Sequence, residues 1–453
     1  MRLTRRHLLA ASAASAAVLA ARAALAAPAT AIGALGRDAS QYGVRPGSPD
    51  DQTRNLQRAI DDCARAQVPL ALPPGVYRTS PLTVSANTHI TGVRGASRLV
   101  LLGNGPSLLS GAGANNAALS DLTLDGGGLR LPERRGLAHL VASNDVRITG
   151  CEVVGCNGNA IILETSSGEI SGNTLRDVAA TAIASLDARG LLVARNTVLG
   201  AAVNGIEILR SAIGDDGTMV IDNRIEGVRA GPGGSGQYGN AINAYRAANV
   251  IVRGNRIRDC DFSAVRGNSS SNIQIVGNSV SNVREVALYS EFAFEGAVIA
   301  SNTVDGAAIG VSVANFSSGG RLATVQGNII RNLFPKRPAG TDPNDGAGIG
   351  IYVEADTAVT GNVIENAPSF GIVAGYGRHL RDVTITGNIV RNASAGIGVS
   401  VVGGAGTALV SGNLIAGATQ GAIVGLDHAR IVIDDLSKVP TNRPITVSGN
   451  LVR

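Results

Sequence analysis

Polar residues recur at fixed offsets from an aliphatic residue in six short segments of the chain. The segments are 160–164, 205–210, 241–246, 264–268, 287–291 and 348–354. In each segment a Gly or Ala precedes an aliphatic residue that we expect to face the protein interior. Because side chains alternate along a strand, the residues one and three positions later then face outward. We therefore expect polar side chains from successive segments to stack into columns on one face.

Aligning the segments predicts two columns and a rim. The first column contains Glu207, Asn243 and Arg266. The second contains Tyr245, Asn268 and Ser290, with Glu164 and Tyr352 further along it, and the rim contains Arg210, Arg246 and Glu291. Later segments carry Gly398, Ser400, Val424 and Leu426 at the equivalent positions, which confines the polar group to the middle of the face.

These residue types suit a groove for an acidic polysaccharide. An arginine can bind a uronate carboxylate through two hydrogen bonds. Arg266 and Tyr245 are the candidates for proton transfer, and Glu207 and Asn243 are the candidates for orienting the substrate carboxylate. This chemistry is elimination or epimerisation, although two carboxylates could instead hydrolyse a glycosidic bond. The absence of Trp argues against a site for neutral sugars. The alternative is an ordinary solvated sheet face whose charges pair across strands, on a non-catalytic envelope protein that binds glycan or protein partners.

Two inserted segments flank the same face, Arg229–Gly239 and Phe334–Gly346. Insertions on one side of a repeat protein commonly form the walls of a binding site. The second insertion contains Asp342-Pro343-Asn344-Asp345, which resembles the Asp-Pro-His-Asp motif of alginate epimerases, with Asn344 in place of the histidine. A plain turn rich in Asp, Pro and Asn is the alternative interpretation.

One turn of the sequence is a candidate metal site, and the histidines are not. Gly214-Asp215-Asp216-Gly217 could hold Ca²⁺ through its two carboxylates, and a simple turn is the alternative. His89, His139, His379 and His428 do not have the spacing of metal ligands, so we expect no zinc. Beyond the possible Ca²⁺, the sequence predicts no cofactor.

A repeated phrase, apolar-x-Gly-Asn, determines how these segments are positioned. Its asparagine position is occupied by Asn173, Asn196, Asn223, Asn255, Asn278, Asn302, Asn328, Asn362, Asn388, Asn413 and Asn450. The shortest spacing, 23 residues from Asn173 to Asn196, fits one coil of a three-sided solenoid, and longer spacings fit loops inserted at its corners. We therefore predict an all-β fold, a right-handed parallel β-helix with an internal asparagine ladder.

An amphipathic helix at about 51–64 should cover the first coil. Asp50-Asp51-Gln52-Thr53 can cap it, and Leu56, Ile60 and Cys63 share one face. The sequence then reads Leu72-Pro73-Pro74-Gly75-Val76-Tyr77-Arg78. This order resembles the opening of pectate-lyase-like proteins, and with the Gly-Asn repeats the resemblance covers residues 38–453. That superfamily contains lyases, hydrolases, epimerases and non-catalytic tail or adhesion proteins, so the resemblance implies the β-helix fold and leaves the function open.

The first 26 residues predict export. Thr4-Arg5-Arg6-His7-Leu8-Leu9 resembles a twin-arginine signal, and an Ala-rich run leads to a cleavage site near Ala26. We expect a periplasmic or secreted protein that keeps no membrane span after cleavage. Removing the arginines of residues 1–26 from the 39 basic residues brings them close to balance with the 34 acidic ones. No Lys/Arg cluster remains, so we expect no nucleic-acid partner.

The four cysteines should be unpaired. Cys151 occupies the asparagine position of its repeat, and Cys156 and Cys260 each follow their own repeat position by five residues. An extended strand between Cys151 and Cys156 separates them beyond the reach of about 7 Å between Cα atoms that a disulfide allows. We therefore predict buried, reduced thiols.

Overall fold

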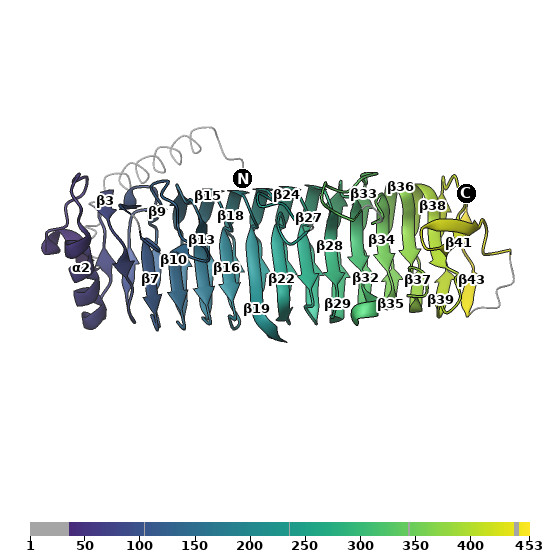
Figure 1. Cartoon of the computed structure of the whole chain (residues 1–453), viewed down its shortest axis with the longest axis horizontal. Coiled ribbons are helices and arrows are strands. Elements are labelled where there is room, and N and C mark those ends of the chain that lie inside the picture. The colour runs from purple at the N-terminus through teal and green to yellow at the C-terminus, as the bar shows by residue number, and fades with distance from the viewer. Residues whose placement is uncertain (1–35, 104, 235, 343–344, 439–443) are drawn as a thin grey trace, which may run out of the picture.

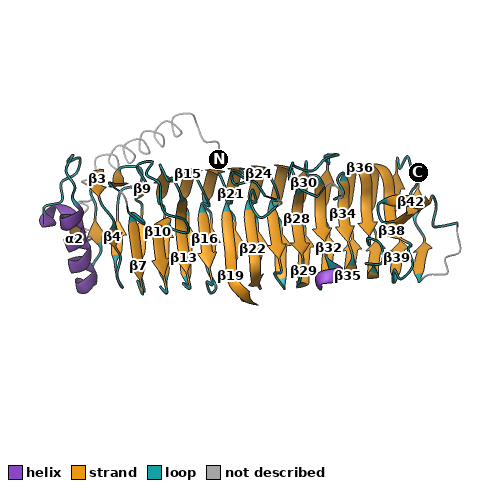
Figure 2. Ribbon diagram, in the orientation of Figure 1, coloured by secondary structure: helices purple, strands orange, loops and turns teal. Residues whose placement is uncertain are grey.

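A computed structural model describes residues 36–103, 105–234, 236–342, 345–438 and 444–453. The predicted signal, residues 1–26, lies outside the described residues. The chain forms a long rod of stacked strands, with α2 (Thr53–Ala66) at one end and the C-terminal strands at the other (Figure 1). Figure 2 shows that strands make up nearly the whole rod. Among the described residues, no helix has the length and apolar character needed to span a membrane.

The rod has three faces, and each coil contributes one strand to each of them. Within a face, the strands of successive coils pair in parallel. Face A is a 16-stranded sheet. It comprises β1 (Arg37–Asp38), β2 (Leu70–Ala71), β5 (His89–Thr91), β8 (Ala118–Ser120), β11 (Val146–Thr149), β14 (Gly168–Ser171), β17 (Leu192–Ala194), β20 (Met219–Ile221), β23 (Ile251–Arg253), β26 (Ile273–Val276), β29 (Glu295–Ala300), β32 (Arg321–Gln326), β35 (Ala355–Thr360), β37 (Arg381–Thr386), β39 (Ala408–Ser411) and β43 (Ile445–Ser448).

Face B follows face A along the chain. It comprises β3 (Gly75–Thr79), β6 (Ser97–Leu101), β9 (Thr123–Asp125), β12 (Glu152–Val154), β15 (Thr174–Val178), β18 (Thr197–Ala201), β21 (Arg224–Val228), β24 (Arg256–Cys260), β27 (Ser279–Val283), β30 (Thr303–Asp305), β33 (Ile329–Arg331), the first parts of β36 (Val363–Ala374) and β38 (Ile389–Ser400), β40 (Leu414–Ala416) and β44 (Leu451–Val452). Because β36 and β38 each run on into the third face, they join the two faces into one sheet.

The third face carries the six segments singled out in the sequence, and we call it the site face. It comprises β4 (Leu82–Thr83), β7 (Leu109–Ala112), β10 (Gly136–Val141), β13 (Asn159–Glu164), β16 (Ile183–Leu186), β19 (Ile206–Asp215), β22 (Ile242–Ala248), β25 (Val265–Asn268), β28 (Val286–Glu291), β31 (Ile309–Val313), β34 (Ile349–Val353), the second parts of β36 and β38, and β41 (Ile423–Asp427). A last strand, β42 (Arg430–Ile433), pairs antiparallel with β41. Two short 3₁₀ helices, η2 (Ala39–Tyr42) and η3 (Phe316–Ser318), complete the described elements.

The interior of the rod is a stack of aliphatic side chains in register. On face A, for example, Val252 pairs with Ile275, and Ile275 pairs with Ile299. All three side chains are buried. Each buried side chain of this size contributes about 1.5–3 kcal/mol, which makes the period-2 pattern the main source of stability.

The asparagine ladder is present as predicted and lies at the corner between faces A and B. The Asn278 amide nitrogen donates to the Asn302 side-chain oxygen at 3.0 Å and to the Val252 carbonyl at 3.0 Å. The residue before each asparagine adopts a left-handed conformation, as in Gly277 (φ 66°). The same conformation occurs at Arg195, Asp222 and Ser301, in the repeats that lack the glycine.

Replacing Asn278 by alanine is expected to lower the free energy of unfolding by roughly 2–4 kcal/mol, because it removes the partners of buried amide groups in two neighbouring coils. Chemical denaturation measures the effect. Gln274→Ala is the matched control, since Gln274 is an exposed amide on the adjoining strand β26. Equal losses in the two variants would contradict a stabilising role for the ladder.

Helix α2 covers the N-terminal end of the rod, with Leu56, Ile60 and Cys63 buried as predicted. The helix runs from Thr53 to Ala66, slightly later than the predicted 51–64. Gln52 occupies the N-cap position without a side-chain capping bond, because its side chain bonds the backbone of Arg45. Asp51 instead accepts a hydrogen bond from the Thr53 amide at 2.8 Å.

All four cysteines are buried and unpaired, as predicted. Cys151 holds the ladder position, where its amide donates to the Asn173 side-chain oxygen at 2.9 Å. Burial raises the pKa of the Cys151, Cys156 and Cys260 thiols to about 12, so the reactive thiolate form is scarce at neutral pH. We expect a thiol reagent to leave these three cysteines unlabelled in the folded protein and to label all four cysteines after denaturation without reductant. A mass increase of two hydrogens on reduction of the intact protein would contradict this.

Candidate functional site

The first predicted column is present on the site face. The sheet register pairs Glu207 with Asn243 and Asn243 with Arg266. The next residues in this column are Tyr289, Ser312 and Tyr352, each on the following coil. Tyr352 therefore belongs to the first column, whereas the sequence alignment placed it in the second.

The second column also differs from the prediction. Tyr245 pairs with Asn268 as expected, but Asn268 then pairs with Glu291, which had been placed at the rim. Ser290 pairs with Gly267 and is fully buried. Glu164 lies in this column three coils before Tyr245, and its carboxylate is 3.0 Å from His139.

The two errors have different causes. In β28 the aligned aliphatic residue, Leu288, does face inward and pairs with Val265, and Glu291 lies three positions after it, so the assignment of Ser290 is one position short. In β34 the inward residue is Ile351 and not the aligned Ile349, which belongs to a separate apolar cluster on the outer side of the strand. Counting from Ile351 places Glu354 three positions later, in an outward-facing position that the sequence analysis did not propose.

Arg266 is almost fully enclosed by the protein. Its Nε donates to the Glu291 carboxylate at 2.6 Å, and its Nη1 lies 3.7 Å from the Glu285 carboxylate. The same nitrogen donates to the carbonyl of Gly236, in the first inserted loop. Its guanidinium carbon is 5.3 Å from the centre of the Tyr289 ring. Arg266 therefore fastens the first insertion to the site face.

The other predicted residues on this part of the face also have protein partners. Glu207 accepts a hydrogen bond from the Asn204 amide at 2.6 Å, and burial raises the pKa of Glu207. The Arg246 guanidinium lies over the Tyr245 ring at 4.8 Å and donates to the Ser211 carbonyl at 2.8 Å. Asn243 is buried, and the Asn268 amide donates to Glu291 at 2.9 Å.

The two carboxylates of the turn proposed for Ca²⁺ lie in different environments, one exposed and one buried. Asp215 is exposed and accepts a hydrogen bond from Asn249 at 2.6 Å. Asp216 is buried, 3.7 Å from Arg210, and burial raises its pKa. Arg210 also donates to the Ala188 carbonyl at 3.1 Å. Within the described part of the chain, no three His, Cys, Asp or Glu side chains are grouped as a metal site would require.

A cavity of about 450 Å³ opens on the site face, beyond Arg266 in the C-terminal direction. Of the residues in the predicted columns and rim, Tyr352 alone lines it, and Asp342 and Asp345 of the Asp-Pro-Asn-Asp motif also contribute. Its floor consists of outward side chains of β28, β31, β34 and β36, namely Tyr289, Ile309, Ser312, Ile349, Tyr352, Phe370 and Val373. These side chains stack because their strands are paired in register, as the sequence repeat requires.

Glu354 lies at one edge of the cavity, directly after β34. Its carboxylate accepts a hydrogen bond from the Tyr352 hydroxyl at 2.7 Å and another from the Phe316 amide at 2.6 Å. The residue is 7% exposed, and this burial raises the pKa of Glu354. Burial also raises the pKa of Tyr352 well above its usual value, so its phenol is neutral and can donate.

The second insertion forms the opposite edge, before the start of β34. Arg337, Asp342, Asp345 and Gly346 line the cavity from this loop. Arg337 lies 3.3 Å from Asp345 and 3.4 Å from Glu285, which is buried at the corner before β28, two coils earlier. The Arg337 Nε also donates to the Gly346 carbonyl at 2.8 Å. The loop is thus held by ion pairs beneath it, and Glu285, which the sequence analysis missed, is central to them.

The C-terminal hairpin closes one end of the cavity. His428, in the turn between β41 and β42, packs edge-on against Tyr376 with ring centres 4.7 Å apart. Its Nδ1 is 2.8 Å from the Asp427 carboxylate. Tyr376 is 40% exposed, so its ring is available at the cavity mouth. Tyr376 and His428 lie outside the aligned segments, and no sequence signal connected them to the site.

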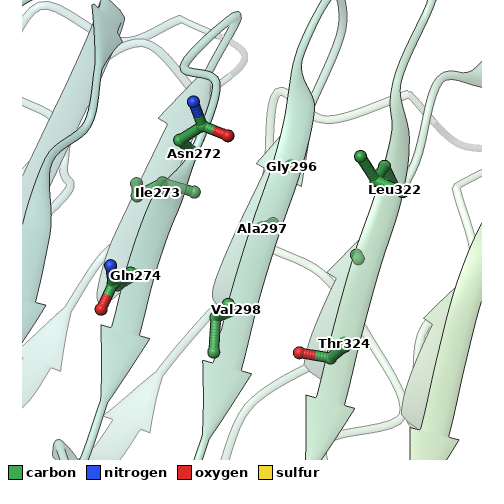
Figure 3. Close-up of a pocket in the computed structure, with 9 residues that line it drawn as sticks. Asn272, Ile273, Gln274, Gly296, Ala297, Val298, Leu322 and Thr324 are labelled. Carbon is green, nitrogen blue, oxygen red and sulfur yellow. The ribbon is translucent and has the colours of Figure 1, made fainter.

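A second hollow of about 460 Å³ lies on face A, across β26, β29 and β32 (Figure 3). Asn272, Gln274, Val298, Leu322 and Thr324 are among its lining residues, and none of the nine lining side chains is ionisable. It therefore offers no acid or base for catalysis. The cavity on the site face is the better candidate for a functional site.

Comparison with known proteins agrees with this architecture. Residues 159–330, and in an overlapping match residues 211–381, match the family model described as a right-handed β-helix region. The protein is a right-handed parallel β-helix. No curated protein matches the chain.

Several solved structures share the fold. The N-terminal fragment of gene product 12 of bacteriophage Phi29 has a TM-score of 0.56 and 14% identity, over 92% of this chain and 71% of that one. The catalytic unit of a GH87 α-1,3-glucanase from Streptomyces thermodiastaticus has a TM-score of 0.52 and 17% identity, over 94% of this chain and 69% of that one. A tailspike protein of E. coli bacteriophage HK620 in complex with a pentasaccharide has a TM-score of 0.55 and 11% identity, over 90% of this chain and 76% of that one. At these identities the likeness concerns the fold alone.

Proposed function

We propose that this protein is a carbohydrate-active β-helix protein that binds a glycan in the cavity on the site face and hydrolyses a glycosidic bond there. The observation that carries the proposal is the position of Glu354, a buried carboxyl with a raised pKa that is hydrogen-bonded to Tyr352 at the edge of this cavity. A carboxyl whose pKa is raised by burial holds its proton to higher pH than an exposed one, which suits it to donate a proton to a leaving oxygen.

Carboxylates at both edges of the cavity support hydrolysis. Glu354 lies after the end of β34, and Asp342 and Asp345 lie before its start. The six residues from Ile349 to Glu354 cover roughly 16 Å of extended strand. Glu354 and Asp345 both line the cavity over this strand, and hydrolysis with inversion requires their carboxyl groups to come within about 6.5–9.5 Å of one another across the sugar and the water. Glu354 would protonate the glycosidic oxygen while Asp345 accepts a proton from the attacking water. The new bond forms between this water and the anomeric carbon as the glycosidic bond breaks.

Glycan binding along this fold has structural precedents. The glucanase and the tailspike in complex with a pentasaccharide share the β-helix architecture. The predicted twin-arginine signal in residues 1–26 would bring the present protein outside the cytoplasm, where polysaccharides are found. The narrower prediction, elimination or epimerisation of an acidic polysaccharide by Tyr245, Arg266 and Glu207, remains a hypothesis. Arg266→Ala with polyuronate substrates tests it.

A screen against oligosaccharides, measuring both affinity and newly formed reducing ends, tests the proposed function. Ser312→Trp should abolish both signals, because Ser312 lies on the cavity floor and a bulky side chain there fills the space. Thr324→Trp fills the face A hollow instead and should leave both signals unchanged. Thermal unfolding of the two variants checks that each is folded. If Ser312→Trp kept its binding and Thr324→Trp lost it, the glycan would bind outside the cavity on the site face, and the proposal would be refuted.

A further inference from the structure

The charge of the cavity lining is unbalanced. Three carboxyl groups, those of Asp342, Asp345 and Glu354, line it. Arg337 is the only arginine or lysine among the described lining residues. With Glu354 protonated, as the proposed function requires, the two aspartates still outnumber the single arginine, so a ligand entering the cavity meets more negative than positive groups.

The positive charge of Arg337 is already used within the protein. The guanidinium lies between Glu285 and Asp345, at 3.4 and 3.3 Å, and donates to the Gly346 carbonyl. Its side chain is 10% exposed. To bind a ligand carboxylate, Arg337 would have to give up one of these partners and leave Glu285 buried with a weaker ion pair. That exchange opposes binding of an anion.

Neighbouring cations are similarly occupied. Arg266 is enclosed by Glu291, Glu285 and the carbonyl of Gly236. His428, the remaining basic group of the lining, is hydrogen-bonded to Asp427, which also accepts a hydrogen bond from Arg430 at 3.0 Å. A uronate or sulfated sugar would thus bring its charge into a partly enclosed site without a free cationic partner, which is unfavourable.

Aromatic rings form a second part of the lining. Tyr289, Tyr352, Phe370 and Tyr376 all border the cavity, out of seven tyrosines and six phenylalanines in the whole chain. Rings of this kind pack against the apolar C–H face of a sugar while their hydroxyl groups bond its edge. The absence of Trp, which argued against a neutral-sugar site, is therefore offset by a local concentration of tyrosine and phenylalanine.

We infer that the cavity takes a sugar unit without negative charge, either uncharged or bearing an amino group, and that it discriminates against uronates and sulfated sugars. The inference rests on the proposed function and narrows its substrate class. It differs from the acidic substrate that the sequence suggested, because Arg266, the arginine proposed to act on that substrate, is paired with Glu291 and Glu285 beneath the surface.

The test is a binding panel on the full mature chain, using oligosaccharides of four to six units. The panel contains uncharged glucans and galactans, deacetylated chitin oligomers, and galacturonan oligomers both as free acids and as their methyl esters. The ester and acid differ only in charge at one position of each sugar. Titration calorimetry at low and at moderate salt gives the affinities, and Ser312→Trp identifies binding that occurs in the cavity.

We expect every cavity-dependent ligand to be uncharged or amino-bearing, and a free acid to bind at least tenfold more weakly than its ester wherever the ester binds. Replacing Asp345 by asparagine should reduce that preference. A free acid that binds in the cavity as tightly as its ester, or more tightly, would overturn the inference and leave the proposed function standing. Absence of cavity-dependent binding across the whole panel would instead overturn the proposed function, and the inference with it.

Discussion

Glu354→Gln is expected to lower the turnover of a cleaved glycan by about 100-fold or more, the range associated with loss of a general acid. Glutamine keeps the size of the side chain, and its oxygen can accept from the Phe316 amide while its nitrogen donates to the Tyr352 hydroxyl, so the affinity should change by less than about threefold. Steady-state kinetics together with equilibrium binding separates the two effects. Glu133→Gln is the matched control, because Glu133 is exposed on a loop remote from the cavity.

The pH dependence gives this prediction a second readout. Burial raises the pKa of Glu354 above its ordinary value of 4.5, and a proton donor acts in its protonated form. Activity should therefore decline as the pH rises through the raised pKa, and Glu354→Gln should lack this limb in its residual activity. The free energy of unfolding should change with pH in the same direction as the activity. The contribution of Glu354 to it is fully present below pH 4.5 and is lost as the pH rises through the raised pKa of the folded state. A variant with normal turnover and an unchanged pH profile would exclude Glu354 as the donor.

Glu285→Gln is expected to lower the free energy of unfolding by roughly 3 kcal/mol, because it leaves two buried guanidinium groups without one of their charge partners. Glu285 is 3% exposed and lies within 3.7 Å of both Arg266 and Arg337. Those arginines hold the two inserted loops that border the site. We therefore expect weaker glycan binding together with the lower stability.

Urea denaturation followed by circular dichroism measures the loss. The matched control is Glu295→Gln, since Glu295 also pairs with an arginine, Arg321, but is 59% exposed in its side chain. An exposed pair contributes about 0–1 kcal/mol, so this variant should stay close to the native protein. Equal midpoints for the two variants would show that Glu285 does not hold the loops through its charge.

Glu285 also explains how the two insertions act together. Arg266 binds the Gly236 carbonyl in the first insertion, and Arg337 belongs to the second. Both arginines lie near the same carboxylate, Arg266 from the coil before Glu285 and Arg337 from the loop before β34, two coils after it. The two loops therefore share one anchor.

The repeat by itself determined the architecture. A Gly-Asn step every 23 residues or more specifies a corner, because glycine accepts the left-handed backbone conformation and asparagine bonds to its copy in the next coil. The alternation of apolar residues between those corners specifies strands with one buried side. The same reasoning predicted the ladder position of Cys151 and the unpaired state of the cysteines. Local patterns sufficed here, because each coil contacts mainly its neighbours.

The site depended on tertiary structure for two physical reasons. First, the columns depend on which aliphatic residue of each strand is aligned, and β34 offered two, Ile349 and Ile351. That choice moved Tyr352 to the other column and concealed Glu354. Second, the sequence places arginines on a face without showing what lies over them. Only the folding of the insertions back onto that face decided that Arg266 and Arg337 pair with buried carboxylates, while Tyr376 and His428 close the cavity.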